Sequence, residues 1–242
     1  MRIDIYLAEN SLAQSRTEAK GLILSGAVKV NGKVVNKPSY DVCDGDSVTV
    51  ESEGKKYVSR GGLKLEAALD SFKIDAMDKT CLDVGASSGG FTDCLLKRGA
   101  ARVIAVDSGS GQMVSSLAND PRVESIENYN ARYMKPEDFN ESIGLAVMDV
   151  SFISATLIIP SLYNCLIDGA DFICLIKPQF EVGRSGLGKG GIVKSPELRQ
   201  KAVNKVIAAA FAVGFECLGV IDSPISGGDG NIEYLAHFRK ND

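Results

Sequence analysis

The sequence lacks the features that mark membrane and exported proteins. Its longest apolar stretches, 153–162 and 206–213, are too short to cross a bilayer. The N-terminal residues, MRIDIYLAEN, include acids and have no apolar core of the kind found in an export signal. We therefore expect a cytoplasmic protein without a membrane partner.

Metal and thiol chemistry also have little support. The six cysteines include no C-x-x-C pair, so we expect reduced, buried thiols and no metal site. The only histidine, His237, lies in the alternating run 234–238. This position is typical of a strand residue rather than of a catalytic histidine.

Basic residues do not dominate the composition, but they are unevenly distributed. The formal net charge is −4, which by itself disfavours a nucleic-acid partner. Residues 16–37 nevertheless contain five lysines and arginines and only one acid, Glu18. This segment predicts a local basic face on an otherwise acidic protein.

The first fifty residues have the pattern of a small α+β module. Apolar residues recur at helical spacing over 4–12, and Ser15 can cap a second helix over 17–25. Short alternating runs surround an Asn-Gly turn and recur at 46–50, which indicates a small sheet with a hairpin.

The text of this module, SRTEAKGLI followed by GAVKVNGKVV, resembles the S-four-type RNA-binding domain. The resemblance assigns 1–52 to that domain, and a polar linker follows over 53–58. It implies that Arg16, Lys20 and Lys29 contact RNA phosphates, which supply affinity rather than sequence choice. The alternative is that these residues form only a solvated face.

The segment 80–107, TCLDVGASSGGFTDCLLKRGAARVIAVD, carries the strongest indication of a ligand site. An apolar strand, a glycine-rich turn, a helix and a second strand ending in Asp107 follow one another. Amides at the start of such a helix attract an anionic group, and an acid about twenty residues beyond the turn can accept hydrogen bonds from ribose hydroxyls. The order predicts a nucleotide-type cofactor site.

The turn departs from the dinucleotide pattern G-x-G-x-x-G, because Ala86 and Ser87 stand where the second glycine is needed. It looks like the S-adenosylmethionine loop of Rossmann-like methyltransferases. That resemblance implies S-adenosylmethionine as the cofactor and assigns a set of binding residues. They are Asp83, Gly85, Ala86, Ser87, Gly89, Phe91, Asp107 and Asn130. Asn130 could equally be a simple turn residue.

Residues 59–242 alternate between strand and helix patterns, which predicts an α/β fold with an open, mostly parallel sheet. Further strands are predicted at 143–149, 171–176, 215–222 and 232–238, and helices at 63–72, 153–163 and 196–213. Ligands bind such sheets at the carboxyl ends of the strands. Asp149 and Lys177 lie at such ends, whereas Glu233 reaches the same edge only if the last strand is antiparallel.

The ordered set Lys64, Asp149, Lys177 and Glu233 resembles the catalytic tetrad of the FtsJ-type ribose 2′-O-methyltransferases. Together with the N-terminal module, the motifs SRGGLKLEAAL, DVGASSGGFTDCLL, MDVSFIS, LIKPQFEVG and GGDGNIEYL look like the TlyA family, often labelled hemolysin A. This family methylates the 2′-hydroxyl of cytidine in ribosomal RNA. The resemblance implies an enzyme with ribosomal RNA as partner and S-adenosylmethionine as methyl donor.

The tetrad implies a division of roles. A ribose hydroxyl is a weak nucleophile, so transfer needs in-line placement and help with its proton. Lys177 is the expected helper, either as a neutral base or as a cation that stabilises the developing alkoxide. Asp149 is expected to orient Lys177 and the sulfonium end of the cofactor, and Glu233 to position Lys64 or the ribose.

A glycine-rich stretch, 182–192, follows the third tetrad motif. It contains G-x-x-x-x-G-K, but the next residue is Gly190 rather than serine or threonine, which disfavours a phosphate-binding P-loop. We expect either a flap over the RNA ribose or a plain surface loop. In the first case Arg184 and Lys189, together with Arg60, contact RNA.

Functions other than methyl transfer also have some support in the sequence. Residues 85–89 satisfy the G-x-S-x-G pattern of serine hydrolases around Ser87, and Asp222 and His237 follow in the order that α/β-hydrolases use. That turn follows the first strand of its domain rather than a later one, which disfavours hydrolysis. A non-catalytic RNA-binding protein and a membrane-active hemolysin, as the family label suggests, stay open as well.

Overall fold

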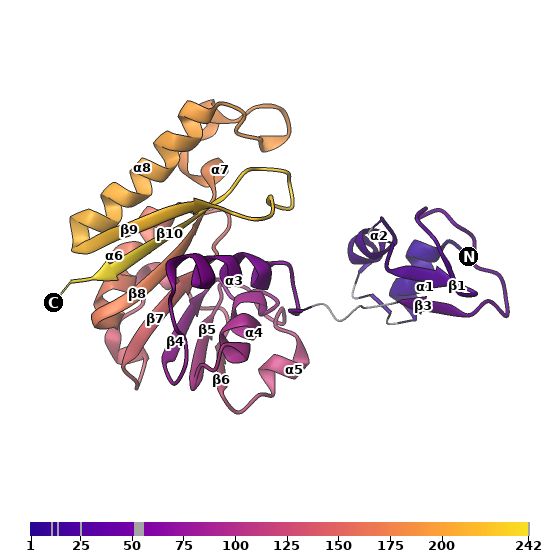
Figure 1. Cartoon of the computed structure of the whole chain (residues 1–242), viewed down its shortest axis with the longest axis horizontal. Helices are drawn as coiled ribbons and strands as arrows, with labels where there is room; N and C mark the ends of the chain where they lie inside the picture. The colour runs from indigo at the N-terminus through magenta and orange to yellow at the C-terminus, as the bar shows by residue number, and fades with distance from the viewer. Residues whose placement is uncertain (11, 14, 25, 51–55, 242) are drawn as a thin grey trace. The chain divides into compact units, whose positions relative to one another are not determined.

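The computed structural model describes residues 1–10, 12–13, 15–24, 26–50 and 56–241. The chain forms two compact units, Met1–Lys55 and Lys56–Asp242 (Figure 1). Residues 51–52 of the predicted RNA-binding domain and 53–55 of the predicted linker lie outside the described residues. No helix in the described part of the chain is long and apolar enough to cross a membrane.

The N-terminal unit combines two helices with a small antiparallel sheet. The helices are α1 (Ile3–Glu9) and α2 (Arg16–Leu24), and the strands are β1 (Val28–Val30), β2 (Lys33–Val34) and β3 (Val48–Val50). The strand order is β2-β1-β3. Buried side chains from both helices and from β1, among them Ile3, Ile23 and Val28, form one core. The predicted α+β module is confirmed.

Local signals of this unit act as the sequence suggests. The hydroxyl of Ser15 accepts a hydrogen bond from the amide of Glu18 at 3.2 Å, as an N-terminal cap does. Asn31 and Gly32 have φ angles of 49° and 77°, and positive values at both positions are what a tight two-residue hairpin turn requires. Ser25, the last residue of the predicted second helix, lies outside the described residues.

The second unit contains one seven-stranded sheet with helices on both faces. The helices are α3 (Gly61–Phe72), α4 (Gly90–Lys97), α5 (Ser115–Ala118), α6 (Ile159–Cys165), α7 (Pro178–Glu181) and α8 (Pro196–Val213). The strands are β4 (Thr80–Val84), β5 (Arg102–Val106), β6 (Val123–Ile126), β7 (Ile143–Met148), β8 (Leu166–Ile176), β9 (Phe215–Asp222) and β10 (Tyr234–Lys240), in the order β6-β5-β4-β7-β8-β10-β9. The predicted α/β fold is confirmed.

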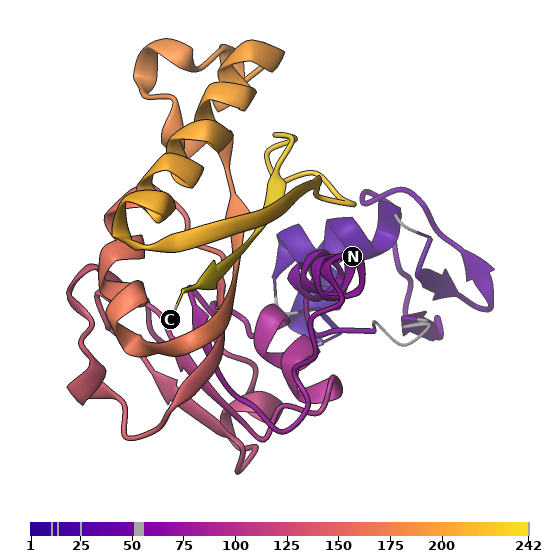
Figure 2. The ribbon, with the colours of Figure 1, turned by 60° about the vertical axis from the view of Figure 1, so that its left-hand side comes forward.

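Strand alternation divides the core of this unit into two layers. On β4, Leu82 and Val84 face a layer that includes residues of α6 and α8, whereas Cys81 faces a layer that includes residues of α3 and α4. Figures 1 and 2 show these two helix pairs on opposite sides of the sheet. Buried strands of this kind read as continuous apolar runs, which is why the sequence marks them well.

The last strand has the direction that Glu233 requires. β10 is antiparallel to both of its neighbours, β8 and β9, while β4, β5, β6, β7 and β8 are parallel. Tyr234 is paired with Ile176, so the start of β10 lies beside the carboxyl end of β8. Glu233 and Lys177, each one residue beyond that pair, therefore reach the same edge of the sheet.

Several predicted elements are wrong in their extent: the helix predicted over 4–12 runs over Ile3–Glu9, the strand predicted at 171–176 begins at Leu166, and the strand predicted at 232–238 runs over Tyr234–Lys240. The largest difference is in a helix. The helix predicted over 153–163 is a 3-10 turn, Ala155–Leu157, followed by α6 from Ile159. Pro160 has no amide hydrogen and is accommodated only in the first turn of a helix, so α6 begins next to it. Residues 149–154 consequently form a loop at the carboxyl end of β7.

Candidate active site

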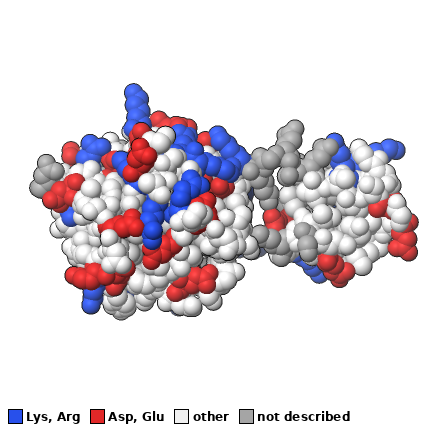
Figure 3. All heavy atoms as spheres, turned by 90° about the horizontal axis from the view of Figure 1, so that it is seen from below, with Lys and Arg blue, Asp and Glu red and all other residues white. Residues whose placement is uncertain are grey.

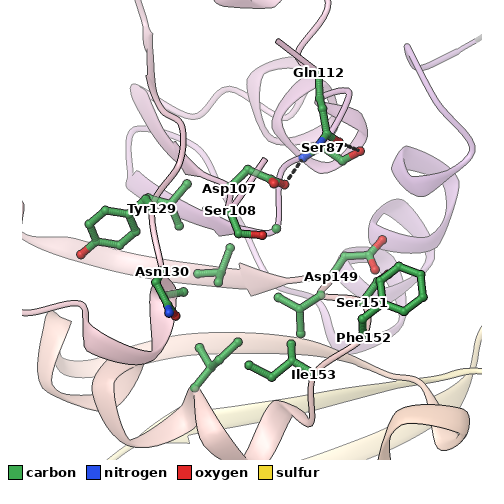
Figure 4. Close-up of a pocket in the computed structure, with 16 residues that line it drawn as sticks. Ser87, Asp107, Ser108, Gln112, Tyr129, Asn130, Asp149, Ser151, Phe152 and Ile153 are labelled. Carbon is green, nitrogen blue, oxygen red and sulfur yellow. Dashed lines mark hydrogen bonds between the residues drawn. The ribbon is translucent and has the colours of Figure 1, made fainter. Parts of the chain in front are cut away.

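Two adjoining cavities lie at the carboxyl ends of the parallel strands. The first, here called the Asp107 cavity, has a volume of about 340 Å³ and is shown in Figure 4. The second, the Lys64 cavity, has a volume of about 280 Å³. Residues of the glycine loop and of the loop after β7 line both: Gly85, Ser87, Asp149 and Ser151. Ligands in the two cavities would therefore meet at these residues.

Asp107 directly follows β5 and forms the polar side of the first cavity. Its carboxylate accepts hydrogen bonds from the amides of Ser87 at 2.8 Å and Gly109 at 2.7 Å. A carboxylate has about four lone-pair positions, so acceptor capacity remains for hydroxyl groups of a ligand. Val106 and Ile158 supply apolar walls nearby. The cavity thus pairs an acid with an apolar slot.

Asn130 combines the two predicted possibilities. Its side chain accepts a hydrogen bond from the amide of Arg132 at 3.2 Å and so caps the 3-10 turn Ala131–Tyr133. It also lines the Asp107 cavity beside Tyr129, and in Figure 4 both lie across the cavity from Asp149 and Ser151. Asn130 is therefore a turn residue placed at the wall of the cavity.

The glycine loop between β4 and α4 approaches neighbouring backbone closely. Gly85 has a φ of 86°, and a Cβ there would lie 2.5 Å from the carbonyl oxygen of Asp149. Gly89 has a φ of 93°, and a Cβ there would lie 2.4 Å from the side chain of Leu117. A side chain at Gly85, which lines both cavities, would push the loop away from the backbone of Asp149, whereas one at Gly89 would displace the side chain of Leu117. Phe91 lies mostly in the core below the loop and reaches the edge of the Lys64 cavity.

Asp83, one residue before the end of β4, is a buried acid with an incomplete set of partners. Thr92 donates a hydrogen bond to its Oδ2 at 2.7 Å, whereas Oδ1 has no hydrogen-bond partner in the described structure. Burial raises the pKa of Asp83 to about 7 against the Thr92 hydrogen bond, and the charge of Asp149 adds to the rise. A buried, unpartnered carboxylate oxygen favours a nearby cation or donor.

All four tetrad residues come together at the Lys64 cavity, in two ion pairs. Lys64 Nζ lies 2.5 Å from Glu233 Oε2, and both side chains are buried. Lys177 Nζ lies 2.6 Å from Asp149 Oδ1 and donates a hydrogen bond to Ser151 Oγ at 2.8 Å. Lys64, Asp149 and Lys177 line the cavity, whereas Glu233 acts on it through Lys64.

The loop after β7 adds residues that sequence reasoning missed. Ser151 holds Lys177, and Phe152 is 93% exposed with a φ of 64°. The ring of Phe152 lies 5.4 Å from that of Phe180, and Phe152 lines the Asp107 cavity. Apolar neighbours in the segment MDVSFIS favour burial of this phenylalanine. The only sequence signal for a place at the site is its position shortly after the carboxyl end of β7.

The residues predicted to bind RNA differ in their surroundings. In the N-terminal unit Arg16 pairs with buried Asp4 at 3.1 Å, Lys20 is exposed and Lys29 is half-buried. In the second unit Arg60 lines the Lys64 cavity, and Arg184 and Lys189 are exposed in two 3-10 turns. On the face drawn in Figure 3, basic side chains of this unit are interspersed with acidic ones.

The hydrolase prediction is wrong, because its three residues do not form a triad. The Ser87 hydroxyl is hydrogen-bonded to Gln112 Oε1 at 3.0 Å. His237 lies in β10, as its alternating run predicts, and its Nε2 is 2.9 Å from Asp171. Neither Ser87 nor Asp222 is bonded to His237 within the described residues.

Comparison with known families finds one family for each of the two units of the chain. The model of the FtsJ-like methyltransferase family matches residues 57–240, and that of the S4 domain matches residues 1–48. The S4 domain is the same RNA-binding module that the N-terminal motifs resemble.

Individual proteins are similar along almost the whole chain. A 16S/23S rRNA (cytidine-2′-O)-methyltransferase TlyA of Mycobacterium tuberculosis is 44% identical over 98% of this chain and 89% of its own length. Hemolysin A of Brachyspira hyodysenteriae is 46% identical over 98% of this chain and 99% of its own. A solved structure from Streptococcus thermophilus, provisionally described as a hemolysin, has a TM-score of 0.81 at 44% identity and covers 100% of this chain and 89% of its own.

Proposed function

Because this chain belongs to the FtsJ-like methyltransferase family and carries an S4 domain, we propose that it methylates the 2′-hydroxyl of a cytidine in ribosomal RNA. S-adenosylmethionine is the proposed methyl donor. The observation that carries the proposal is the pairing of Lys177 with Asp149 and Ser151, where the two cavities adjoin. The enzyme acts in the cytoplasm, where ribosomal RNA is processed.

The residues around the Asp107 cavity fit S-adenosylmethionine. The free acceptor capacity of Asp107 suits ribose hydroxyls, and the apolar slot beside Asn130 suits an adenine ring. Asp83 is fully buried and lines neither cavity, but it directly precedes Val84 of the cavity wall, and its unpartnered Oδ1 suits a donor or cation such as the ammonium group of the methionine part. Gly85, Ala86, Ser87, Gly89 and Phe91 complete this binding site. When bound, S-adenosylmethionine supplies an electrophilic methyl group on a sulfonium.

Lys177 is the residue that acts on the ribose hydroxyl. Its amine nitrogen donates a hydrogen bond to Ser151 Oγ and forms an ion pair with Asp149 Oδ1 at 2.6 Å. These two contacts hold the nitrogen at the cavity, where it can meet the substrate hydroxyl. As a neutral amine it removes the hydroxyl proton, and as a cation it stabilises the alkoxide with an N–H that Ser151 does not use.

Lys64 and Glu233 prepare the other side of the same cavity. The buried ion pair holds Lys64 in one place, because the carboxylate of Glu233 compensates its charge. Its amine group is then held in the cavity that Lys177 also lines, where it contributes a positive charge. That charge favours an electron-rich ribose oxygen during transfer.

The RNA is bound by charge and by stacking. Arg60 lines the Lys64 cavity and is exposed. Arg184 and Lys189 are exposed in the loop that follows α7. We assign all three side chains to phosphates of the substrate RNA. Lys20, Lys29 and Arg16 add phosphate contacts from the S4 domain. The exposed ring of Phe152 offers a stacking surface for an unstacked base near the cavity.

The test is transfer of labelled methyl from S-adenosylmethionine to unmodified ribosomal subunits and to their naked RNA. Lys177→Ala is expected to lower transfer at least a thousandfold, while cofactor affinity measured by calorimetry changes less than threefold. Lys201→Ala, an exposed lysine on α8, is the matched control and should retain full activity. Label on a base instead of a ribose would contradict the proposal.

Lys177→Arg separates the two roles of Lys177. Arginine keeps the positive charge but does not lose its proton at any ordinary pH. If Lys177 acts as the base, the arginine variant should be as inactive as the alanine variant. If it stabilises the alkoxide, the arginine variant should retain at least a tenth of the native rate.

A further inference from the structure

Glu181, the last residue of α7, has contacts that the tetrad chemistry does not use. Its side chain is only 2% exposed. Oε1 accepts a hydrogen bond from the amide of Ala155 at 2.7 Å, and Oε2 accepts one from the hydroxyl of Ser154 at 2.5 Å. Lys205 of α8 donates to Oε2 and to the backbone carbonyl of Glu181, each at 3.0 Å. The carboxylate therefore joins three separate segments.

The segment that Glu181 holds is the loop after β7. At its start, the amide of Asp149 donates to the carbonyl of Val84 at 2.9 Å, so this end is fixed by the sheet. At its far end, Ser154 and Ala155 are fixed by Glu181. Ser151 and Phe152 lie between the two anchors, and together with Asp149 they form one side of the cavity in Figure 4.

This loop contains a residue with a strained backbone, and the contacts of Glu181 with Ser154 and Ala155 help to hold it. Phe152 has a positive φ although it is a bulky residue and not glycine, which strains the backbone. Such a conformation persists only where the surroundings impose it. Glu181 supplies that constraint from the same short helix that begins directly after Lys177.

We propose that Glu181 is a positioning residue for Lys177, because it fixes the loop that carries Asp149 and Ser151 against the helix that follows Lys177. The inference rests on the function proposed above. The short helix α7 fixes how far Lys177 lies from Glu181. The loop after β7 fixes how far Asp149 lies from Ala155. Glu181 connects the helix and the loop, so the amine of Lys177 is placed beside Ser151 Oγ and the Asp149 carboxylate.

The test uses the full chain with Glu181→Gln, which keeps the size of the side chain. The amide oxygen can replace one of the two carboxylate oxygens, but the NH₂ group at the other position cannot accept a hydrogen bond, so either Ala155 or the pair Ser154 and Lys205 loses its acceptor. Hydrogen exchange of the peptide spanning 149–156 is expected to accelerate at least tenfold, while the peptide spanning 143–148 is unchanged. The turnover number at saturating RNA and cofactor is expected to fall at least tenfold, at a temperature where both proteins are fully folded.

Two further variants separate positioning from charge compensation. If Glu181 only neutralises Lys205, the double variant Glu181→Gln, Lys205→Met should recover the native turnover number. Under the proposal it stays at least tenfold low, because glutamine cannot accept from both Ser154 and Ala155. Glu216→Gln, which alters an exposed acid on β9, is the matched control and should leave exchange and turnover within threefold of native.

Several outcomes would overturn the proposal. Unchanged exchange over 149–156 in Glu181→Gln would show that the carboxylate does not fix the loop. Faster exchange with a turnover number within threefold of native, or recovery in the double variant, would leave Glu181 a structural role only. A native chain that transfers no methyl would refute the proposed function, and the exchange measurement would still decide whether Glu181 fixes the loop.

Discussion

Asp83 and Asp171 are both buried acids in the strands of one sheet, yet their surroundings are opposite. Asp171, in the middle of β8, is bonded to His237 at 2.9 Å and Arg239 at 2.8 Å, and Lys79 lies 3.5 Å away. Asp83, near the carboxyl end of β4, has one oxygen without a hydrogen-bond partner in the described structure.

The pKa values of the two acids reflect this difference. Burial alone would raise the pKa of Asp171, but the hydrogen bonds from His237 and Arg239 outweigh it and lower the value to about 2. Burial raises the pKa of Asp83 to about 7. The carboxylate of Asp171, which supports the fold, thus has protein donors and cations as partners. The carboxylate of Asp83 lacks a partner for one oxygen, which a ligand can supply.

The largest expected effect is on stability, at the satisfied acid. Asp171→Ala leaves buried His237 and half-exposed Arg239 without their acceptor, so the free energy of unfolding should fall by about 3 kcal/mol. Urea unfolding measures the loss. Cofactor affinity of the folded protein should change less than threefold, because Asp171 lies outside both cavities. A loss below about 1 kcal/mol would contradict the comparison.

Substitution of Asp83, the acid with an unpartnered oxygen, is expected to raise the free energy of unfolding rather than lower it. Asp83→Asn removes a charge that is costly to bury, so unfolding of the cofactor-free protein at pH 8 should require about 2 kcal/mol more than in the native chain. S-adenosylmethionine affinity, measured by calorimetry, should fall at least tenfold. Lower stability in this variant would mean that the native carboxylate is compensated after all.

The pH dependence of stability should separate the two acids. Asp83 has a folded pKa of about 7, above the unfolded value of about 3.9, so its contribution to stability declines as the pH rises between these values. Asp171 has a folded pKa of about 2, so its contribution is lost as the pH falls from about 4 to 2. Urea unfolding of the native chain across pH 2 to 8 should show both slopes. Asp83→Asn should flatten only the upper one, and Asp171→Asn only the lower.

The smallest effect is expected at an exposed ring beside the unsatisfied edge. Phe152→Ala should raise the KM for RNA about tenfold through lost stacking. Its unfolding free energy should stay within about 0.5 kcal/mol of native, because the ring is exposed. Phe211→Ala removes a ring that is 75% exposed on α8 and should leave the KM unchanged. Equal effects of the two substitutions would argue against a specific stacking site.

Much of the second unit could be predicted because its signals are local. The strand at 80–84, the helix at 196–213 and the strand at 215–222 were predicted with the bounds that the structure has. Continuous apolar runs, a capping serine and a terminal glycine mark such elements within a few residues. The helix at 153–163 was predicted too long, because its apolar pattern extends before Pro160, which is accommodated in the first turn of α6.

The site was predictable only where residues stand at strand ends in a known order. Asp149 and Lys177 follow β7 and β8, so their meeting at one edge could be inferred from a parallel sheet. Ser151 and Glu181 were missed, since neither has an unusual neighbourhood in the sequence. Their roles depend on bonds to Lys177, Ser154 and Ala155, which lie about 26 residues away in the chain.

The sequence by itself determined the elements, their order, the glycine loop and the resemblance to a family, because these depend on periodicity and turn chemistry over short distances. Tertiary structure alone decided which charges are satisfied. Lys64 meets Glu233 across 169 residues, and His237 meets Asp171 across 66. Such pairs form only when the antiparallel β10 is inserted beside β8, and that choice is made by packing of the whole sheet rather than by any one segment.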